Sequence, residues 1–251
     1  MKIITFCILS ILIWESALFA QKEKFKNPLG LTIEYGVGST AIVDEYISQE
    51  RYTGSMPFIG FWYGRVHEKS AYQLGLTFQQ GENYKNYATT ADFTRVSLNY
   101  DLFYAVKKFS LFTKSAVFSL GPSAEYFEYE FNTNFVGNYS AFSELIMVSL
   151  GMNFGIDYYI SERFTTNLFL RTNILGVSAK THDSRRFEDM DTKFLSLFTT
   201  NNINVDLSAK YKLLKFLSPG IKLKGQYTRS SSWDPSKTFT NSVLLFITFH
   251  I

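Results

Sequence analysis

The feature that most constrains this chain is a period of two in its apolar residues, repeated in ten segments. In residues 146–158, Ile146, Val148 and Leu150 share one face, while Ser149 and Gly151 share the other. Successive side chains of a strand point to opposite faces, so this period predicts strands and not helices. Residues 56–66 are apolar on both faces, which leaves the orientation of that strand open. The predicted strands are 31–37, 56–66, 72–78, 96–102, 118–126, 146–158, 168–174, 203–211, 221–227 and 243–251.

The connections between these strands alternate between long polar stretches and short turns. The long ones are 41–55, 81–92, 129–143, 179–196 and 230–238, and the short ones are 67–70, 105–111, 161–163 and 213–219. Transmembrane barrels of the bacterial outer membrane have an even strand number, long outer loops and short periplasmic turns. The sequence therefore predicts an all-β, up-and-down antiparallel transmembrane β-barrel of about ten strands, with long outer loops and short periplasmic turns.

The second face of these strands carries charges in mid-strand, where a soluble sandwich core could not hold them. A soluble sheet with this face in water remains possible for any one strand. Ten such strands without a helix, however, leave nothing to cover the apolar side. In a membrane barrel the charged face lines the lumen, and equal numbers of acids and bases predict a charge-paired network. Its members are Glu34, Arg95, Asp101, Glu125, Asp157, Arg171, Asp206, Lys210, Lys222 and Lys224. The residues expected to face lipid are Leu98, Leu120, Val148, Leu150, Met152, Phe154, Leu168, Leu170, Leu223, Leu245 and Ile247.

The N-terminus has the layout of a secretory signal peptide. Lys2 precedes an apolar run from Ile3 to Trp14, and small residues follow up to Ala20. The predicted organisation is a cleaved signal peptide (1–20), a polar lead-in (21–29) and one outer-membrane barrel domain (30–251). The only cysteine, Cys7, lies in the apolar run, so the expected mature chain has no thiol.

Two segments carry a family resemblance: Leu120-Gly121-Pro122-Ser123-Ala124-Glu125-Tyr126, and residues 150–161 with the tight turn that follows. In these segments the chain resembles the small outer-membrane β-barrel proteins of Gram-negative bacteria, the OmpA/OmpX- and PorT-like group. The resemblance implies outer-membrane lipid and lipopolysaccharide as surroundings, and the barrel-assembly machinery as a partner of the C-terminal strand. We expect no cofactor. Surface or secretion-system proteins are further candidate partners. Such barrels usually end in an aromatic residue, whereas this chain ends Phe249-His250-Ile251.

The sequence offers little for catalysis or metal binding. A net charge of +3 is too small for a nucleic-acid footprint, and no two His or Cys stand at metal-ligand spacing. Of three histidines, only His182 falls in an outer loop, beside Asp183. A catalytic histidine needs a carboxylate to orient it, but adjacent side chains diverge in an extended chain. The other charges of that loop, including Lys180, are interpreted as hydrated.

These observations favour a non-enzymatic barrel with a closed lumen, because a barrel of about eight strands is just filled by its own side chains. Such a protein would act structurally or by surface interaction through its outer loops. Two alternatives stay open: a narrow channel or transporter for small solutes, and an outer-rim hydrolase that uses His182.

Overall fold

The computed structural model describes residues 29–45, 47–67, 69–86, 89–134, 140–182, 191–196, 200–230 and 235–251. The signal peptide and most of the lead-in predicted above lie outside these residues. In the described ranges no helix is long and apolar enough to cross a membrane. The strands are β1 (Leu29–Asp44), β2 (Ser48–Val66), β3 (Ser70–Lys85), β4 (Thr90–Leu111), β5 (Lys114–Asn134), β6 (Ser140–Tyr159), β7 (Phe164–His182), β8 (Asp191–Ser196), β9 (Thr200–Tyr211), β10 (Leu217–Ser230) and β11 (Ser236–His250).

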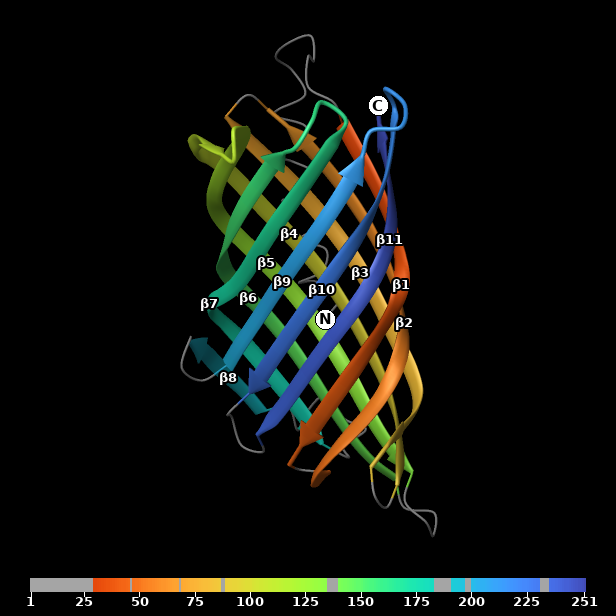
Figure 1. Cartoon of the computed structure of the whole chain (residues 1–251). Coiled ribbons are helices and arrows are strands. Elements are labelled where there is room, and N and C mark those ends of the chain that lie inside the picture. Colours follow the sequence, from red (N-terminus) through yellow and green to blue (C-terminus); the bar gives the residue numbers. More distant parts are fainter. Residues whose placement is uncertain are drawn as a thin grey trace.

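Ten of these strands form a closed antiparallel barrel (Figure 1). Each pairs with its neighbour in the chain, β1 pairs with β11 from Gly30↔His250 to Asp44↔Ser236, and the β6–β7 pairing completes the ring. The short turns and the C-terminus lie at the upper end of Figure 1. The predicted up-and-down barrel of ten strands is thereby confirmed.

The eleventh strand, β8, lies in the stretch 179–196, which the sequence analysis treated as a loop. β7 pairs with β9 over Phe164–Thr172 and then with β8 over Leu175–Lys180. The loop assignment is therefore wrong at both ends of this stretch, because residues 179–182 continue β7 and residues 191–196 form β8.

The strands also extend further toward the outer end than predicted. β1 runs to Asp44 and β2 begins at Ser48, so most of the long polar stretch 41–55 is strand. β4 has 22 residues and extends at both ends, so the prediction of a turn at 105–111 is wrong because these residues continue β4 and pair with β5. Crossing the hydrocarbon takes only about 9–11 residues. We call the part of the wall beyond the apolar surface the outer extension. It comprises residues 39–44, 48–55, 80–85, 90–94, 128–134, 140–145, 178–182, 229–230 and 236–238.

Around the middle of the barrel, apolar side chains point outward and polar side chains point inward. Leu150 and Leu245 are 64% and 66% exposed, as expected for a surface that meets lipid. The other predicted lipid-facing residues also occupy outward positions, between inward neighbours. In β2 the structure settles the orientation that the sequence left open, with Phe58 and Trp62 buried inside. We call this zone the lipid belt.

Inside the outer extension and the first residues of the wall next to it the pattern inverts, and eleven buried residues form an apolar core. They are Ile42, Tyr52, Met56, Tyr84, Ala91, Phe93, Phe127, Tyr129, Phe131, Leu145 and Met147. All of them belong to β1–β6. The facing wall of β10 and β11 buries small hydroxyl residues instead, among them Thr228, Ser236 and Thr238. At this end the large side chains inside the lumen therefore come from β1–β6.

Candidate functional site: the barrel lumen

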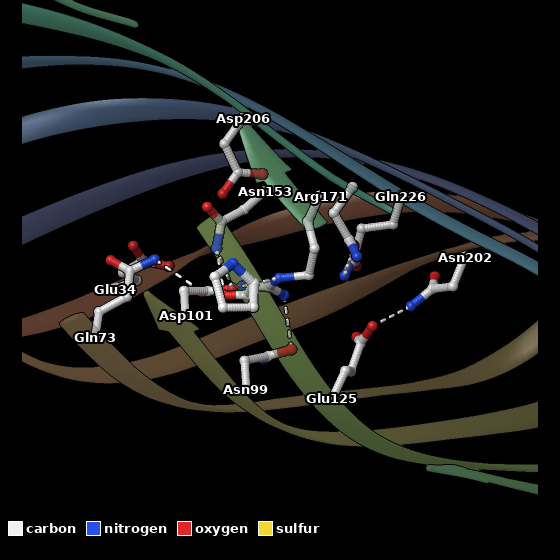
Figure 2. Close-up of polar contacts among 12 residues, drawn as sticks. Glu34, Gln73, Asn99, Asp101, Glu125, Asn153, Arg171, Asn202, Asp206 and Gln226 are labelled. Atoms are coloured by element: carbon white, nitrogen blue, oxygen red, sulfur yellow. Dashed lines mark hydrogen bonds and ion pairs between the residues drawn. The ribbon is translucent and has the colours of Figure 1, made fainter. Parts of the chain in front are cut away.

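The centre of the lumen is crossed by an ion pair between Arg171 of β7 and Asp101 of β4 (Figure 2). Arg171 Nε donates to Asp101 Oδ1 at 2.9 Å, and its Nη1 donates to Asn99 Oδ1 at 2.7 Å. Both charged side chains are almost completely buried. A buried charge is tolerated when a partner and hydrogen bonds compensate it, and Arg171 meets both conditions with Asp101 and Asn99.

Amide side chains surround this pair and connect strands across the lumen. Gln73 Nε2 donates to Asp101 Oδ2 at 3.0 Å. Gln79 of β3 donates to Gln226 of β10 at 2.9 Å, and Gln226 in turn donates to Asn204 of β9 at 3.0 Å. These bonds lie on the face of each strand that the sequence analysis assigned to the lumen.

The remaining predicted lumen charges also occupy inward positions. Glu125 accepts a hydrogen bond from Asn202 (Figure 2), and Arg95 Nη1 donates to Thr228 Oγ1 at 3.4 Å. Asp157 accepts from Asn167 Nδ2 at 2.9 Å.

A second cluster of charges lies closer to the short turns. Lys222 Nζ contacts Glu34 Oε1 and lies 3.9 Å from Asp206 Oδ2. It also lies 5.4 Å from the centre of the Trp62 ring, and Lys224 Nζ lies 5.1 Å from that of Phe58. Such cation–π contacts are favourable for a buried ammonium group.

One buried ion pair was missed by the sequence analysis. Lys180 Nζ donates to Asp44 Oδ1 at 3.1 Å, and Ser143 Oγ donates to Asp44 Oδ2 at 2.9 Å. The interpretation of Lys180 as a hydrated loop residue is wrong, since it is 4% exposed inside the barrel. With Asp44 and Lys180 added, the charge network described above has six acids and six bases. Between the Leu150↔Leu175 and Gly151↔Asn173 pairs, β7 has a bulge that shifts its alternation by one residue. A strict period of two continued from Arg171 would therefore place Lys180 on the outward face, whereas it lies inside.

At the short-turn end the lumen opens into a cavity of about 570 Å³, which we call the vestibule. All ten barrel strands contribute to its wall. Its lining extends from turn residues such as His67 and Lys69 to Glu34, Trp62 and Asp206. Predicted network members Asp157, Lys210 and Lys222 also line it. Nothing in the sequence pattern distinguishes these residues from the other inward charges.

At the outer rim, the structure describes fewer side chains. His182 pairs with Ser143 in the β6–β7 register, but its side chain and Asp183 lie outside what the structure describes. His250 hydrogen-bonds Ser218 Oγ at 2.9 Å, at the short-turn end. On the outer surface the carboxylates of Glu128, Glu130 and Glu144 bring ligand atoms within 4.8 Å of one another.

A closed antiparallel barrel with charges inside and an apolar belt outside defines the class of integral outer-membrane β-barrel proteins. The protein is thus a small outer-membrane barrel located in that membrane. No family model and no curated protein matches the sequence.

Among solved structures, the outer-membrane protease OmpT of Escherichia coli is similar, with a TM-score of 0.57 and 8% identity over 92% of this chain and 99% of OmpT. Neisserial surface protein A gives a TM-score of 0.43 and 6% identity over 88% of this chain and 97% of that chain. Ail of Yersinia pestis gives 0.32 and 8%, over 88% and 98%. At such identities the likeness to OmpT establishes the fold alone. A fold alone does not decide the function of a protein.

Proposed function

We propose that the protein is a closed outer-membrane barrel that conducts no solute and acts structurally or through contacts of its outer surface. The observation that carries this proposal is the apolar core of the outer extension, whose large rings fill the lumen. The ring centres of Phe93 and Tyr129 are 5.8 Å apart. Tyr52 packs edge-on against Phe131, with their ring centres 5.1 Å apart. Tyr129 also reaches across to Ser236 of β11 with a 2.9 Å hydrogen bond, so the core contacts the opposite wall.

A second barrier supports closure. The Arg171–Asp101 pair and the Gln79–Gln226 hydrogen bond join strands across the lumen. A wide, water-filled pore does not need such matched contacts, because solvent screens the charges on its wall. A solute would have to displace both the polar layer and the apolar core, which disfavours the channel alternative.

The outer extension is the part of the molecule available to partners outside the membrane. Its outward residues include Arg51, Thr53, Glu82 and Asp92, all exposed. Lipopolysaccharide headgroups and surface or secretion-system proteins are the partners that we propose for this surface. The barrel-assembly machinery is proposed to engage β11. The proposed role is non-enzymatic, and the hydrolase alternative depends on His182 alone.

Planar-bilayer recording tests the closed lumen. The purified protein, shown to be folded by its heat-modifiable gel mobility, should give no steady single-channel steps. A matched variant with both barriers weakened, Phe127→Ala with Phe131→Ala and Arg171→Ala, should leak more than the wild type. Reproducible conductance steps in the wild type would establish the channel alternative instead.

A further inference from the structure

The hairpin of β4 and β5 projects beyond the neighbouring strand β3 at the short-turn end, where it is the yellow-green hairpin at the upper left of Figure 1. β3 begins at Ser70, which pairs with Tyr104 of β4, and the N–H of Ala105 donates to the carbonyl of Lys69 at 2.9 Å. β4 continues well beyond this point. In the described part of the chain, residues 106–111 therefore border β5 on one side and no strand on the other.

This free edge distinguishes β4 from its neighbours. Other strands at the same end are paired on both sides almost to their ends, as Ser115↔Tyr159 and Phe164↔Tyr211 show. An unpaired edge presents a row of N–H and C=O groups that can pair with another strand. We call residues 106–111 the open edge.

The turn of the hairpin determines which backbone groups face away from β5. The two residues of the turn, 112–113, have φ values of 47° and 67°, as in the two-residue turn of type I′. Leu111 and Lys114 flank this turn and form a hydrogen-bonded pair, and such pairs alternate along an antiparallel ladder. Ser110 and Lys108 therefore direct their N–H and C=O groups toward the open side.

The two faces of the open edge carry different side chains. Lys108 lines the mouth of the vestibule, whereas Phe109 and Leu111 lie on the opposite face of the strand. Val106 is exposed, and Phe112 at the tip is 84% exposed. A strand added here would place its inward side chains beside a positive charge and its outward side chains beside apolar groups.

Positive charge is concentrated at this end of the barrel. Eight Lys or Arg residues and two Glu residues occur in the stretches 65–70, 105–115, 161–163 and 212–217. Their excess of six charges is larger than the net charge of +3 of the whole chain, so the remainder of the chain is negative. Lys69, Lys107 and Lys108 are exposed at or beside the open edge, and no ion pair holds their ammonium groups within the described ranges. The surroundings of the open edge therefore favour an acidic partner.

Like charges disfavour two other occupants of the open edge. If two copies of the protein paired through this edge, Lys107 and Lys108 of one copy would lie near the same residues of the other, which is destabilising across strands. The predicted lead-in of the chain itself contains Lys22, Lys24 and Lys26, so it carries the same sign of charge.

We propose that the open edge binds an extended acidic segment of a periplasmic protein, which adds a strand to β4. The backbone groups of Lys108 and Ser110 hydrogen-bond to the segment. Its acidic side chains lie beside Lys108 and Lys69, and its apolar side chains pack next to Phe109. This interface is on the periplasmic side and goes beyond the outer-surface role proposed above, and it does not depend on whether the lumen conducts.

Binding of short labelled peptides tests the proposal. The folded protein is placed in phosphatidylcholine nanodiscs, which leave both ends of the barrel accessible. A fluorescein-labelled hexapeptide of alternating valine and glutamate should bind saturably at physiological salt, measured by fluorescence anisotropy. The same peptide with lysine in place of glutamate should bind at least about tenfold more weakly, because it places like charges beside Lys69 and Lys108.

Two pairs of matched variants separate charge from backbone pairing. Lys108→Glu should weaken binding of the acidic peptide by about tenfold or more, whereas Lys114→Glu, the same change on the other strand of the hairpin, should alter it by no more than about twofold. Ser110→Pro removes an N–H group of the open edge and should abolish binding, whereas Ser110→Ala keeps that group and should leave binding unchanged. Heat-modifiable gel mobility shows whether each variant is folded.

The proposal is overturned if neither peptide binds, if both bind equally, or if Lys108→Glu and Lys114→Glu have equal effects. Binding that persists in the folded Ser110→Pro protein also overturns it, and the two lysine variants decide the matter even if Ser110→Pro does not fold. If phosphatidylglycerol in the nanodiscs abolishes binding of the acidic peptide, lipid phosphates occupy these lysines and the proposal is wrong. Conductance in planar bilayers would contradict the closed barrel without affecting these results.

Discussion

The lipid belt and the outer extension are built from the same strands with opposite patterns. On β6, Leu150 is outward in the belt and Asn153 is inward, whereas in the extension Glu144 is outward and Leu145 is buried inside. The pairing with β5 continues through both zones without a break in register, from Ser115↔Tyr159 to Asn134↔Ser140. The pleat is therefore the same, and only the surroundings differ.

The comparison shows how one strand can pass from lipid into water. In lipid the outward face must be apolar, and the enclosed face can hold paired charges. Beyond the membrane the outward face meets water, and the enclosed face then becomes an ordinary apolar core. The outer extension is in this respect organised like a soluble protein placed on top of a membrane protein.

Removal of a buried base is the strongest test of this difference. We expect Arg171→Met in the belt and Lys180→Met in the extension each to lower the free energy of unfolding by about 3–5 kcal/mol, because each removes the cation of a buried ion pair and leaves the carboxylate's charge in place. Urea unfolding in phospholipid vesicles measures the effect. Adding Asp101→Asn to Arg171→Met, or Asp44→Asn to Lys180→Met, should recover most of the loss. Additive losses in either double variant would contradict the assigned pair.

The second-largest difference in stability between the two zones is expected when a charge is introduced on the outward face. Leu150→Arg places a charge against lipid and should cost about 2–4 kcal/mol. Thr53→Arg, outward on β2 in the extension, should change stability by no more than about 0.5 kcal/mol. Heat-modifiable mobility and urea unfolding of the two variants give the comparison, and equal losses would remove the boundary between belt and extension.

The smallest expected effect concerns the contribution of hydroxyl groups to the apolar core. Tyr129→Phe removes the hydrogen bond to Ser236 Oγ but keeps the ring, so it should cost about 1 kcal/mol. The lumen should stay closed in bilayer recordings. A much larger loss of stability would mean that polar contacts, and not ring packing, hold the extension together.

The sequence predicted the belt better than the extension, for a physical reason. In most strands of the belt, apolar residues alternate with polar or charged ones, so the ten strands and the outward positions of residues such as Leu223 follow from the period of two. In the extension the outward face is polar and the inward face is partly aromatic, a mixture that resembles loop composition. Asp44 and Lys180 were missed there.

Other features depend on three-dimensional geometry and leave no periodic signal. The bulge that turns Lys180 inward changes the alternation by one residue. On the inner face of β2, Lys222 and Lys224 lie over the rings of Trp62 and Phe58. The vestibule is a space left between side chains of separate strands. Residues that line it, such as Glu34 and Asp206, are far apart in the sequence.

The one-sided origin of the apolar core has a consequence for the order of assembly. Every residue of that core belongs to β1–β6, which are contiguous in sequence, whereas the closing β1–β11 contact joins the two ends of the barrel domain. Pairings between distant segments form slowly because of the chain entropy they cost. We therefore expect the first six strands to curl around their own side chains before the last strands arrive. Pulse-labelled hydrogen exchange should then show protected amides at Phe93 and Phe131 earlier than at Leu245, and simultaneous protection would contradict this order. The small hydroxyl residues of β10 and β11 would then favour rapid closure, because strands with small inward side chains can pair without displacing the apolar core that is already in place.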